Sequence, residues 1–190
     1  MRKYIPNGIL TVPEKAELVF SGKIFNVYQW PQKLFDGTTE TFEMLSRTDT
    51  VKIIAIKDNK IIITRQKQPR KDWFYDLPGG RNDNPAETEL DAAKREMLEE
   101  TGMSFRTWKL VEVHQPFMKI DWLVYTFIAT SFISQEPQKL DGGEQIEVEE
   151  VDFEQLKDIA KTEERFAKYS TIDKATTLDD LLNAQSLCNY

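Results

Sequence analysis

The stretch that decides the fold covers residues 80–103 and reads GRNDNPAETELDAAKREMLEETGM. Leu90, Ala93 and Met97 recur in it at the spacing of one buried helical stripe. Gly79 and Gly80 precede the expected helix, and a backbone without side chains there can approach a ligand closely. A strand-like run at 51–64 lies further upstream. This order of strand, glycine-rich loop and acidic helix makes a phosphate and metal site plausible.

The ends of the expected helix carry their own signals. Asn84 is the expected N-cap, a proline follows it, and Glu87 completes a pattern like a capping box. Gly102 is the expected C-terminal stop. Asp91 and Arg95 stand four residues apart, so we expect them to pair and to orient the arginine beside the carboxylates.

Three carboxylates crowd one side of this helix. At 100° per residue, Glu96, Glu99 and Glu100 fall within an arc of about 100°. Like charges so close repel each other and do not stabilise the helix. Hard cations such as Mg²⁺ bind oxygen ligands of this kind, usually together with substrate phosphates. The alternative is a solvated acidic face.

The same segment resembles the Nudix box, G-x5-E-x7-R-E-U-x-E-E-x-G-U, in which U is an apolar residue. The matching residues are Glu87, Arg95, Glu96, Met97, Glu99, Glu100, Gly102 and Met103. The chain departs from the pattern at one place, because six residues instead of five separate Gly80 from Glu87. The metal-binding half of the motif is intact.

The resemblance continues outside the box, toward the ADP-ribose pyrophosphatase branch of the Nudix hydrolases. Residues 21–37 are similar to its N-terminal strands, residues 141–148 to its late acidic loop and strand, and residues 170–182 to its closing helix. It implies an α+β fold in which a mixed β-sheet is sandwiched between helices (α/β/α). Residues 1–48 are then a small N-terminal β-sheet appendage at a dimer interface, and residues 49–190 form the hydrolase domain.

The implied chemistry is Mg²⁺-dependent hydrolysis, with Mn²⁺ as a substitute, of the diphosphate linkage of a nucleoside diphosphate sugar. For ADP-ribose the products are AMP and ribose 5-phosphate. The expected metal ligands are the Gly80 carbonyl, Glu96, Glu99 and Glu100. Arg95 and Glu87 hold the helix and its glutamates, and Glu99 also positions water. Glu144 is the general base that the resemblance suggests, against the alternative of a surface loop glutamate.

Six further residues are candidate substrate contacts: Arg65, Arg70, Trp73, Tyr28, Pro116 and Asp121. Stacking on a base by Trp73 competes with plain core packing, and phosphate contacts by the arginines compete with ordinary surface charge. The related branch carries an arginine where this chain has Gln68, and Arg70 could replace it. The one histidine, His114, is interpreted as a strand or loop residue, because no partner spacing suggests zinc or a catalytic triad. The alternative is that residues 114–116 line the pocket, since the related branch carries a proline near this place.

Two rival functions stay open. One is the same chemistry on a GDP-sugar, an oxidised nucleoside triphosphate or a dinucleoside polyphosphate. The other is a non-catalytic sensor of a nucleotide sugar, although such proteins commonly lose the box glutamates that this chain keeps. A substrate panel and a binding measurement separate these possibilities.

Composition favours a soluble cytoplasmic enzyme, and the resemblance implies that it binds a small-molecule nucleotide and forms a homodimer. The chain has 190 residues and a net charge of −7, which disfavours nonspecific nucleic-acid binding. Its single cysteine, Cys188, fits a reducing cytoplasm. The longest apolar-rich run, 122–133, is too short to span a membrane, and we find no signal-peptide pattern.

Coarse periodicity predicts the remaining elements. The expected strands are 17–19, 24–29, 39–46, two within 51–64, 109–113, 122–133 and 146–151, and the expected helices are 153–160 and 177–185. A turn is expected at Asp58 and Asn59 between the paired strands.

Overall fold

A computed structural model describes residues 2–188 of the chain. Its strands are β1 (Glu17–Ser21), β2 (Asn26–Lys33), β3 (Thr39–Ser46), β4 (Thr50–Lys57), β5 (Lys60–Gln68), β6 (Lys71–Asp76), β7 (Met103–His114), β8 (Ile120–Asp121), β9 (Val124–Gln135) and β10 (Gln145–Val151). Its helices are α1 (Glu89–Thr101), α2 (Phe153–Thr162), the 3₁₀ turn η1 (Phe166–Lys168), α3 (Ser170–Lys174) and α4 (Leu178–Leu182).

The main sheet is mixed and has the strand order β10-β5-β4-β9-β7. Strands β4 and β9 are parallel, and the other neighbours are antiparallel. β4 pairs with β5 only near the turn at Asp58, and β6 pairs along the other end of β5. The glycine loop lies beside β4 instead, since Val51 N–H donates to Gly80 O at 2.9 Å and Ile53 N–H to Pro78 O at 2.9 Å. This arrangement brings the loop and helix α1 beside the central strand.

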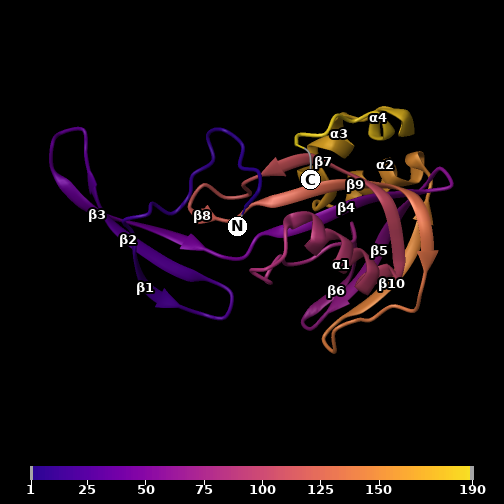
Figure 1. Ribbon diagram of the computed structural model, residues 1–190, viewed down its shortest axis with the longest axis horizontal. Coiled ribbons are helices and arrows are strands. Elements are labelled where there is room, and N and C mark those ends of the chain that lie inside the picture. The colour runs from indigo at the N-terminus through magenta and orange to yellow at the C-terminus, as the bar shows by residue number, and fades with distance from the viewer. Residues whose placement is uncertain (1, 189–190) are drawn as a thin grey trace.

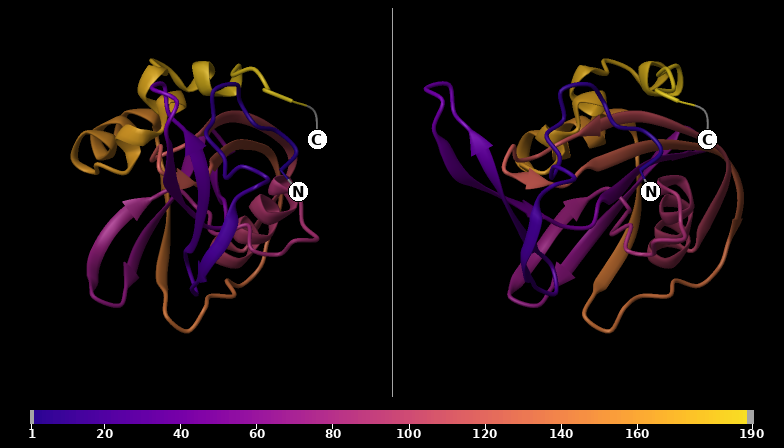
Figure 2. Two further views of the ribbon diagram at one scale, coloured as in Figure 1. Left: turned by 90° about the vertical axis from the view of Figure 1, so that its left-hand side faces the viewer. Right: turned by 60° about the vertical axis from the view of Figure 1, so that its left-hand side comes forward.

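Helices cover both faces of the main sheet (Figures 1 and 2). On one face, Met97 of α1 packs in a fully buried cluster with Ile53 and Phe127. On the other face, Leu156 of α2 and Phe166 join a second buried cluster that contains strand residues such as Ile54. Alternate side chains of β4 therefore serve two cores, as a strand buried on both faces requires. The expected α/β/α arrangement is confirmed.

Helix α1 begins four residues later than the sequence suggested. Thr88, not Asn84, is the N-cap, and its hydroxyl accepts a hydrogen bond from Asp91 N–H at 3.1 Å. The Asp91 carboxylate completes the capping box by accepting from Thr88, so it does not pair with Arg95. Asn84 instead stabilises the preceding turn through Ala86 N–H. Asn84 and Thr88 are both residues that can cap a helix, and Thr88, which lies nearer the helix body, is the one that does so. Gly102 ends the helix, as predicted.

The N-terminal strands form a separate four-stranded sheet in the order β1-β2-β3-β8. In Figure 1 this sheet projects from the left of the main body. Strand β8 belongs to the later part of the chain and pairs parallel with β3, so the expected boundary at residue 48 stays a prediction. Several apolar side chains of the N-terminal sheet and its hairpins are open to solvent: Phe20 is 60% exposed and Phe35 is fully exposed. A single chain leaves this sheet without a complete cover.

Three other elements differ from expectation. The closing helix expected at 170–182 is two short helices, α3 and α4, separated at residues 175–177. β6 was not expected as a strand, and β7 begins at Met103 instead of near residue 109. Among residues 2–188, no helix combines the length and the apolar character needed to cross a membrane.

Candidate active site

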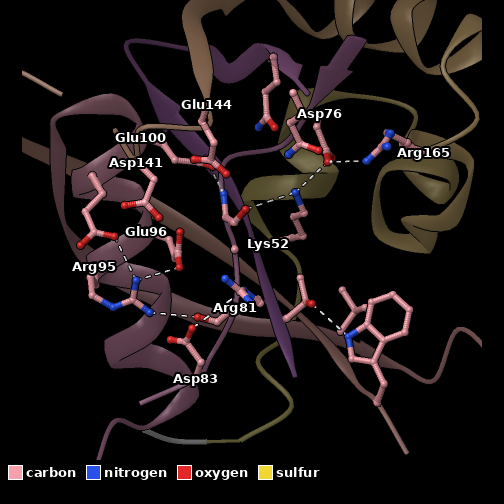
Figure 3. A pocket seen from close by; sticks show the side chains of 18 of the residues that line it. Lys52, Asp76, Arg81, Asp83, Arg95, Glu96, Glu100, Asp141, Glu144 and Arg165 are labelled. Carbon is pink, nitrogen blue, oxygen red and sulfur yellow. Dashed lines mark hydrogen bonds and ion pairs between the residues drawn. The ribbon is translucent and has the colours of Figure 1, made fainter. Parts of the chain in front are cut away.

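A cleft of about 650 Å³ lies beside the glycine loop and the polar face of α1. Its walls include α1, the loop before β10, the central strand β4 and the connection from α2 to α3, and residues of β5, β7 and neighbouring loops complete the lining. Figure 3 shows the acidic side chains gathered on one side and Asp76 with Arg165 on the other, with Lys52 between them. The two sides of the cleft therefore differ in chemical character.

The acidic side is built from α1 and the loop at 139–144. Glu96, Glu99 and Glu100 line it from the helix, and Asp141 and Glu144 face them from the loop (Figure 3). A backbone turn from Glu144 N–H to Asp141 O, 3.0 Å long, holds the loop pair together. Five carboxylates thus share one side of a cleft, which is electrostatically costly unless a cation accompanies them.

The two loop glycines allow the glutamates to lie against the backbone. Gly79 has a φ of 136°, and a side chain there would collide with Val51 O. Its N–H donates to Glu100 Oε2 at 2.8 Å. A side chain at Gly80 would meet the carboxylate of Glu96. Glycine is therefore required at Gly79, whereas a side chain at Gly80 would displace the carboxylate of Glu96 from its place against the loop.

Arg95 fixes the directions of the helix carboxylates. Its Nη1 donates to Glu96 Oε1 at 2.8 Å and to Glu99 Oε2 at 3.0 Å. Its Nε lies 3.2 Å from both oxygens of Glu87, and its Nη2 donates to Arg81 O at 3.0 Å. One guanidinium thus connects both ends of the matched motif, which is the supporting role expected for Arg95 and Glu87.

Burial and crowding raise the pKa values of the acidic side chains. Burial raises the pKa of Glu100 to about 8, and the charges of Glu96 and Glu144 add to this effect, whereas Lys52 opposes it. Burial is also the main cause that raises the pKa of Glu96, against the opposing effect of Arg95. Glu144 has its pKa raised by burial and then by Asp141. Each of these shifts would be reversed by a bound cation.

The donor set fits a hard divalent cation. All the side-chain donors of the acidic side are carboxylate oxygens, which Mg²⁺ and Mn²⁺ prefer. Within residues 2–188 no three acidic groups already converge as a ligand set. Arg95 instead binds Glu96 and Glu99, and the Gly79 N–H binds Glu100. The Gly80 carbonyl, an expected ligand, accepts from Val51 N–H, while Gly79 O lies nearer Lys52 Nζ, at 3.5 Å.

Lys52 forms the floor between the two sides of the cleft. It projects from β4, is mostly buried, and donates to Asp76 Oδ2 at 2.8 Å and to Leu77 O at 3.1 Å. Tyr169 donates its hydroxyl to the other oxygen of Asp76 at 2.9 Å. The sequence analysis did not select Lys52 or Asp76, because a lysine inside an apolar strand has no local pattern that marks it as part of a site.

The other side of the cleft carries positive charge. Arg47 lies over the Trp122 ring at 4.5 Å and over the Phe25 ring at 5.6 Å, and its Nε is buried without a hydrogen-bond partner. Burial lowers its pKa, and the charge of Arg81 lowers it further. No carboxylate within residues 2–188 pairs with Arg47, and the guanidinium lines the cleft. An unpaired, desolvated cation of this kind is suited to an anionic ligand.

Two further cations reach the cleft from the connection between α2 and α3. Arg165 lies over the Phe74 ring at 4.2 Å, and Lys168 lies nearby in the same wall. Gln68, which occupies the place of an arginine in the related branch, also lines this wall. Sequence inspection missed Arg47, Arg165 and Lys168, because charged residues in loops are common and only the tertiary fold places all three in the lining of one cleft.

Two expected substrate contacts lie outside the cleft. On β5 and β6 the side chains alternate, so Gln66 and Phe74 face inward while Arg65 and Trp73 face outward. Arg65 stacks over the Trp73 ring at 4.8 Å and pairs with Glu147 at 3.1 Å. The geometry of this chain therefore does not support Arg65 and Trp73 as substrate contacts, and the surface alternative describes them better.

The other four expected contacts have mixed positions. Pro116 lines the cleft, as predicted. Arg70 lies at the β5–β6 hairpin in an open hollow that adjoins the cleft at Gln68 and Glu144, and Tyr28 lies in the N-terminal sheet. Asp121 is buried and is held by Arg2 Nη1 at 2.6 Å and by Val12 N–H at 2.8 Å. Its carboxylate is thus engaged in tying down the N-terminal segment and does not line the cleft.

Residues 46–173 match the model of the NUDIX domain, and the chain therefore belongs to this family. It shares 28% identity over 176 residues with an ADP-ribose pyrophosphatase of Bacillus subtilis (strain 168), a match that covers 89% of this chain and 94% of the relative. A crystal structure of an ADP compounds hydrolase has the same fold, with a TM-score of 0.67 at 17% identity, over 85% of this chain and 90% of the other.

These similarities confirm the predicted family and its relation to the ADP-ribose pyrophosphatase branch. The chain is a pyrophosphohydrolase, and hydrolases of this family generally use divalent metal ions. The matched region contains the whole acidic side of the cleft.

Proposed function

We propose that this protein hydrolyses the diphosphate linkage of a nucleoside diphosphate sugar in the presence of Mg²⁺, with Mn²⁺ as a substitute. The substrate we propose is ADP-ribose, which with one water molecule yields AMP and ribose 5-phosphate. The observation that supports this most is the acidic side of the cleft, where α1 and the loop at 139–144 place five carboxylates in a cleft that cations also line. The name of the Bacillus subtilis relative supports the choice of ADP-ribose.

Glu96, Glu99 and Glu100 would hold the metal, together with a backbone carbonyl of the glycine loop. A bound divalent cation supplies charge neutralisation at the diphosphate and lowers the pKa of a water molecule. Glu144 faces these glutamates and would accept the proton of the attacking water, a role that suits a carboxylate whose pKa burial has raised. Arg95 would keep Glu96 and Glu99 in place through the hydrogen bonds described above.

The cationic wall would bind the substrate's anionic groups. Arg47, Arg165 and Lys168 line the same cleft as the carboxylates, so they would contact anionic groups of a substrate whose diphosphate lies at the acidic side. Gln68 in place of an arginine keeps the other nucleotides open as alternatives, because one guanidinium contact of the related branch is missing. The sensor alternative is disfavoured, since every glutamate of the motif is present and points into or supports the cleft.

The proposal includes a homodimer that forms through the N-terminal sheet. Apolar side chains of this sheet, including Leu18, Phe20 and Phe35, are exposed in a single chain. Pairing of two chains would bury them, and it could bring Tyr28 toward the cleft of the second chain. Light scattering of the protein and of Phe20→Ser tests this, with a shift toward monomer expected for the variant. A cytoplasmic location is also proposed, and it rests on the single Cys188.

The function is tested by incubating the purified protein with ADP-ribose, with Mg²⁺ or with a chelator, and by identifying the products. We expect AMP and ribose 5-phosphate only when metal is present, and a large loss in Glu100→Gln. A matched panel of a GDP-sugar, an oxidised nucleoside triphosphate and a dinucleoside polyphosphate defines the substrate class. Equal activity with metal, with chelator and in Glu100→Gln would contradict the metal-carboxylate proposal, and tight binding without turnover would favour a sensor.

A further inference from the structure

Glu112 on β7 is a buried acid that the proposed reaction does not use. Its Oε1 accepts a hydrogen bond from Ser170 N–H at 3.1 Å. Its Oε2 accepts from Thr171 N–H at 2.8 Å and from the Thr171 hydroxyl at 2.9 Å. Burial alone would raise the pKa of Glu112, but His114, Thr171 and Ser170 bring it to about 2. The start of α3 therefore holds an ionised carboxylate at a fixed position below the cleft.

His114 lies two residues further along β7, on the same face of the strand. Its Nδ1 is buried, makes no hydrogen bond in the structure, and lies 3.4 Å from Glu112 Oε1. The side chain is 27% exposed and lines the cleft. Because Nδ1 is buried against the carboxylate, the exposed part of the ring is the edge that carries Nε2. A carboxylate beside Nδ1 favours the proton on that nitrogen, and Nε2 is then left as a hydrogen-bond acceptor.

The position of His114 separates it from the metal chemistry. His114 on β7 pairs with Val124 on β9, which pairs with Thr50 on β4, and these residues form a row across the sheet. Two strand spacings put His114 roughly 10 Å from β4, which adjoins the glycine loop. A substrate whose diphosphate lies at the acidic side would therefore present a more distant group to His114.

The chemistry of Nε2 selects a hydroxyl group as its partner. An acceptor needs a donor, and a sugar offers several hydroxyls, whereas a base is usually bound between aromatic faces. The nearby Trp122 ring has little free surface for a base, since Arg47 lies over it at 4.5 Å and Phe117 stacks on it at 6.3 Å. A fully ionised phosphate has no proton to donate to Nε2. The cations Arg165 and Lys168, which line the same cleft, are better partners for it.

We propose that His114 is a specificity-determining residue whose Nε2 accepts a hydrogen bond from a hydroxyl of the sugar phosphate half of the substrate, and that Glu112 is the positioning residue that orients it. This inference rests on the proposed function for the place of the diphosphate. It adds a contact that distinguishes a sugar from a second base or from a bare phosphate.

The test compares binding of the two halves of the substrate. Inhibition by ribose 5-phosphate and by AMP is measured during ADP-ribose hydrolysis for the unaltered enzyme, His114→Ala and His114→Gln. We expect His114→Ala to weaken inhibition by ribose 5-phosphate roughly 10-fold, the size of one lost hydrogen bond, and to leave inhibition by AMP unchanged. His114→Gln, whose amide oxygen can accept, should restore much of the affinity. Arg106→Ala, exposed on the same strand and outside the cleft, is the matched control.

A second variant tests the positioning role. Glu112→Gln offers an amide where the carboxylate stood, which disturbs the choice of imidazole tautomer, so it should reproduce the selective loss for ribose 5-phosphate. Thermal unfolding of each variant shows whether it is folded. Unchanged inhibition by ribose 5-phosphate in His114→Ala would overturn the inference, and so would weaker inhibition by AMP alone, which would place the contact in the AMP half of the substrate.

The outcome stays distinct from that of the proposed function. If no nucleoside diphosphate sugar is hydrolysed, the proposed function fails, and calorimetric titration of ribose 5-phosphate into the protein and into His114→Ala still tests the hydroxyl contact. If ADP-ribose is hydrolysed and both proteins bind ribose 5-phosphate equally, only the inference about His114 fails.

Discussion

The two sides of the cleft are built in different ways. The acidic side comes from one helix and one loop, and a single guanidinium, Arg95, connects two of its five carboxylates, Glu96 and Glu99, with Glu87. The cationic side is assembled from residues far apart in the chain, with Arg47 before β4 and Arg165 after α2. The expected metal ligands therefore lie in one contiguous motif, whereas Glu144 and the cations that would choose the substrate are added by tertiary structure. Changes on the acidic side should mainly reduce kcat, and changes on the cationic side should mainly raise KM.

The largest effect is expected from Glu100→Gln. It keeps the side-chain shape but removes the charge that would bind the metal, so we expect kcat/KM to fall roughly 10²- to 10³-fold, mostly through kcat. Steady-state kinetics with ADP-ribose and Mg²⁺ measure this. Glu154→Gln, an exposed residue of α2, is the control and should behave like the unaltered enzyme. A higher KM with unchanged kcat in Glu100→Gln would contradict the expected difference between the acidic and the cationic side of the cleft.

A smaller loss is expected from Arg95→Ala. The arginine touches no substrate in this account, but without it Glu96 and Glu99 lose the hydrogen bonds that direct them. Supporting residues of this kind typically change activity or metal affinity 10- to 100-fold, and we expect a fall in that range together with a higher Mg²⁺ requirement. Titration of Mg²⁺ against activity checks both effects. Activity that is insensitive to this change would show that the carboxylates are positioned without the arginine.

The variant Arg47→Ala tests the cationic side of the cleft. We expect KM for ADP-ribose to rise roughly 10-fold, the cost of one charge-assisted contact, while kcat stays within about threefold. Arg47→Lys should recover only part of the affinity, because an ammonium lacks the planar fork of a guanidinium. The exposed Arg106→Ala serves as the control. A drop in kcat with unchanged KM would place Arg47 in the chemical step and break the comparison.

The smallest effect concerns stability without metal. The pKa of Glu100 is raised from 4.5 to about 8 in the folded chain. Below pH 4.5 Glu100 is protonated in both the folded and the unfolded state, so it does not change the free energy of unfolding. Between pH 4.5 and about 8 the unfolded state ionises first, so this group lowers the free energy of unfolding as the pH rises.

Urea unfolding at pH 5 and pH 8 with a chelator measures that decline. Glu100→Gln should lose less stability than the unaltered protein over this interval, and added Mg²⁺ should restore stability to the unaltered protein alone. Glu112 does not interfere, because its pKa is lowered to about 2 and its contribution to stability changes only at more acidic pH. An identical decline in both proteins would show that Glu100 is not the responsible group.

Much of the fold and of the acidic side could be predicted because the signals are local. The buried stripe of α1 and its end at Gly102 follow from spacing and residue type within one segment. The start of α1 was misplaced because two capping sequences lie four residues apart, and their competition depends on packing. The β6 strand and the outward positions of Arg65 and Trp73 depend on pairing with β5, which no single segment specifies.

The cationic side and the polar floor could not be predicted for a related reason. Lys52 lies in an otherwise apolar strand, and its meaning depends on Asp76 and Leu77, which the fold places 2.8 Å and 3.1 Å from its Nζ. The proposed role of His114 depends on Glu112, which accepts hydrogen bonds from backbone N–H groups at the start of α3, far along the chain. Long-range contacts between ordinary polar residues leave no periodic or motif signal in the sequence.

The central claim, that the carboxylates of α1 bind a divalent cation, is tested most directly by calorimetry. Mn²⁺ or Mg²⁺ is titrated into the protein at pH 7 in two buffers of different ionisation enthalpy, with and without AMP. Because the pKa of Glu100 is about 8 before binding, the account predicts binding with release of about one proton, and loss of that release in Glu100→Gln. No binding of either cation in the presence of nucleotide, or the same proton release in Glu100→Gln, would contradict it.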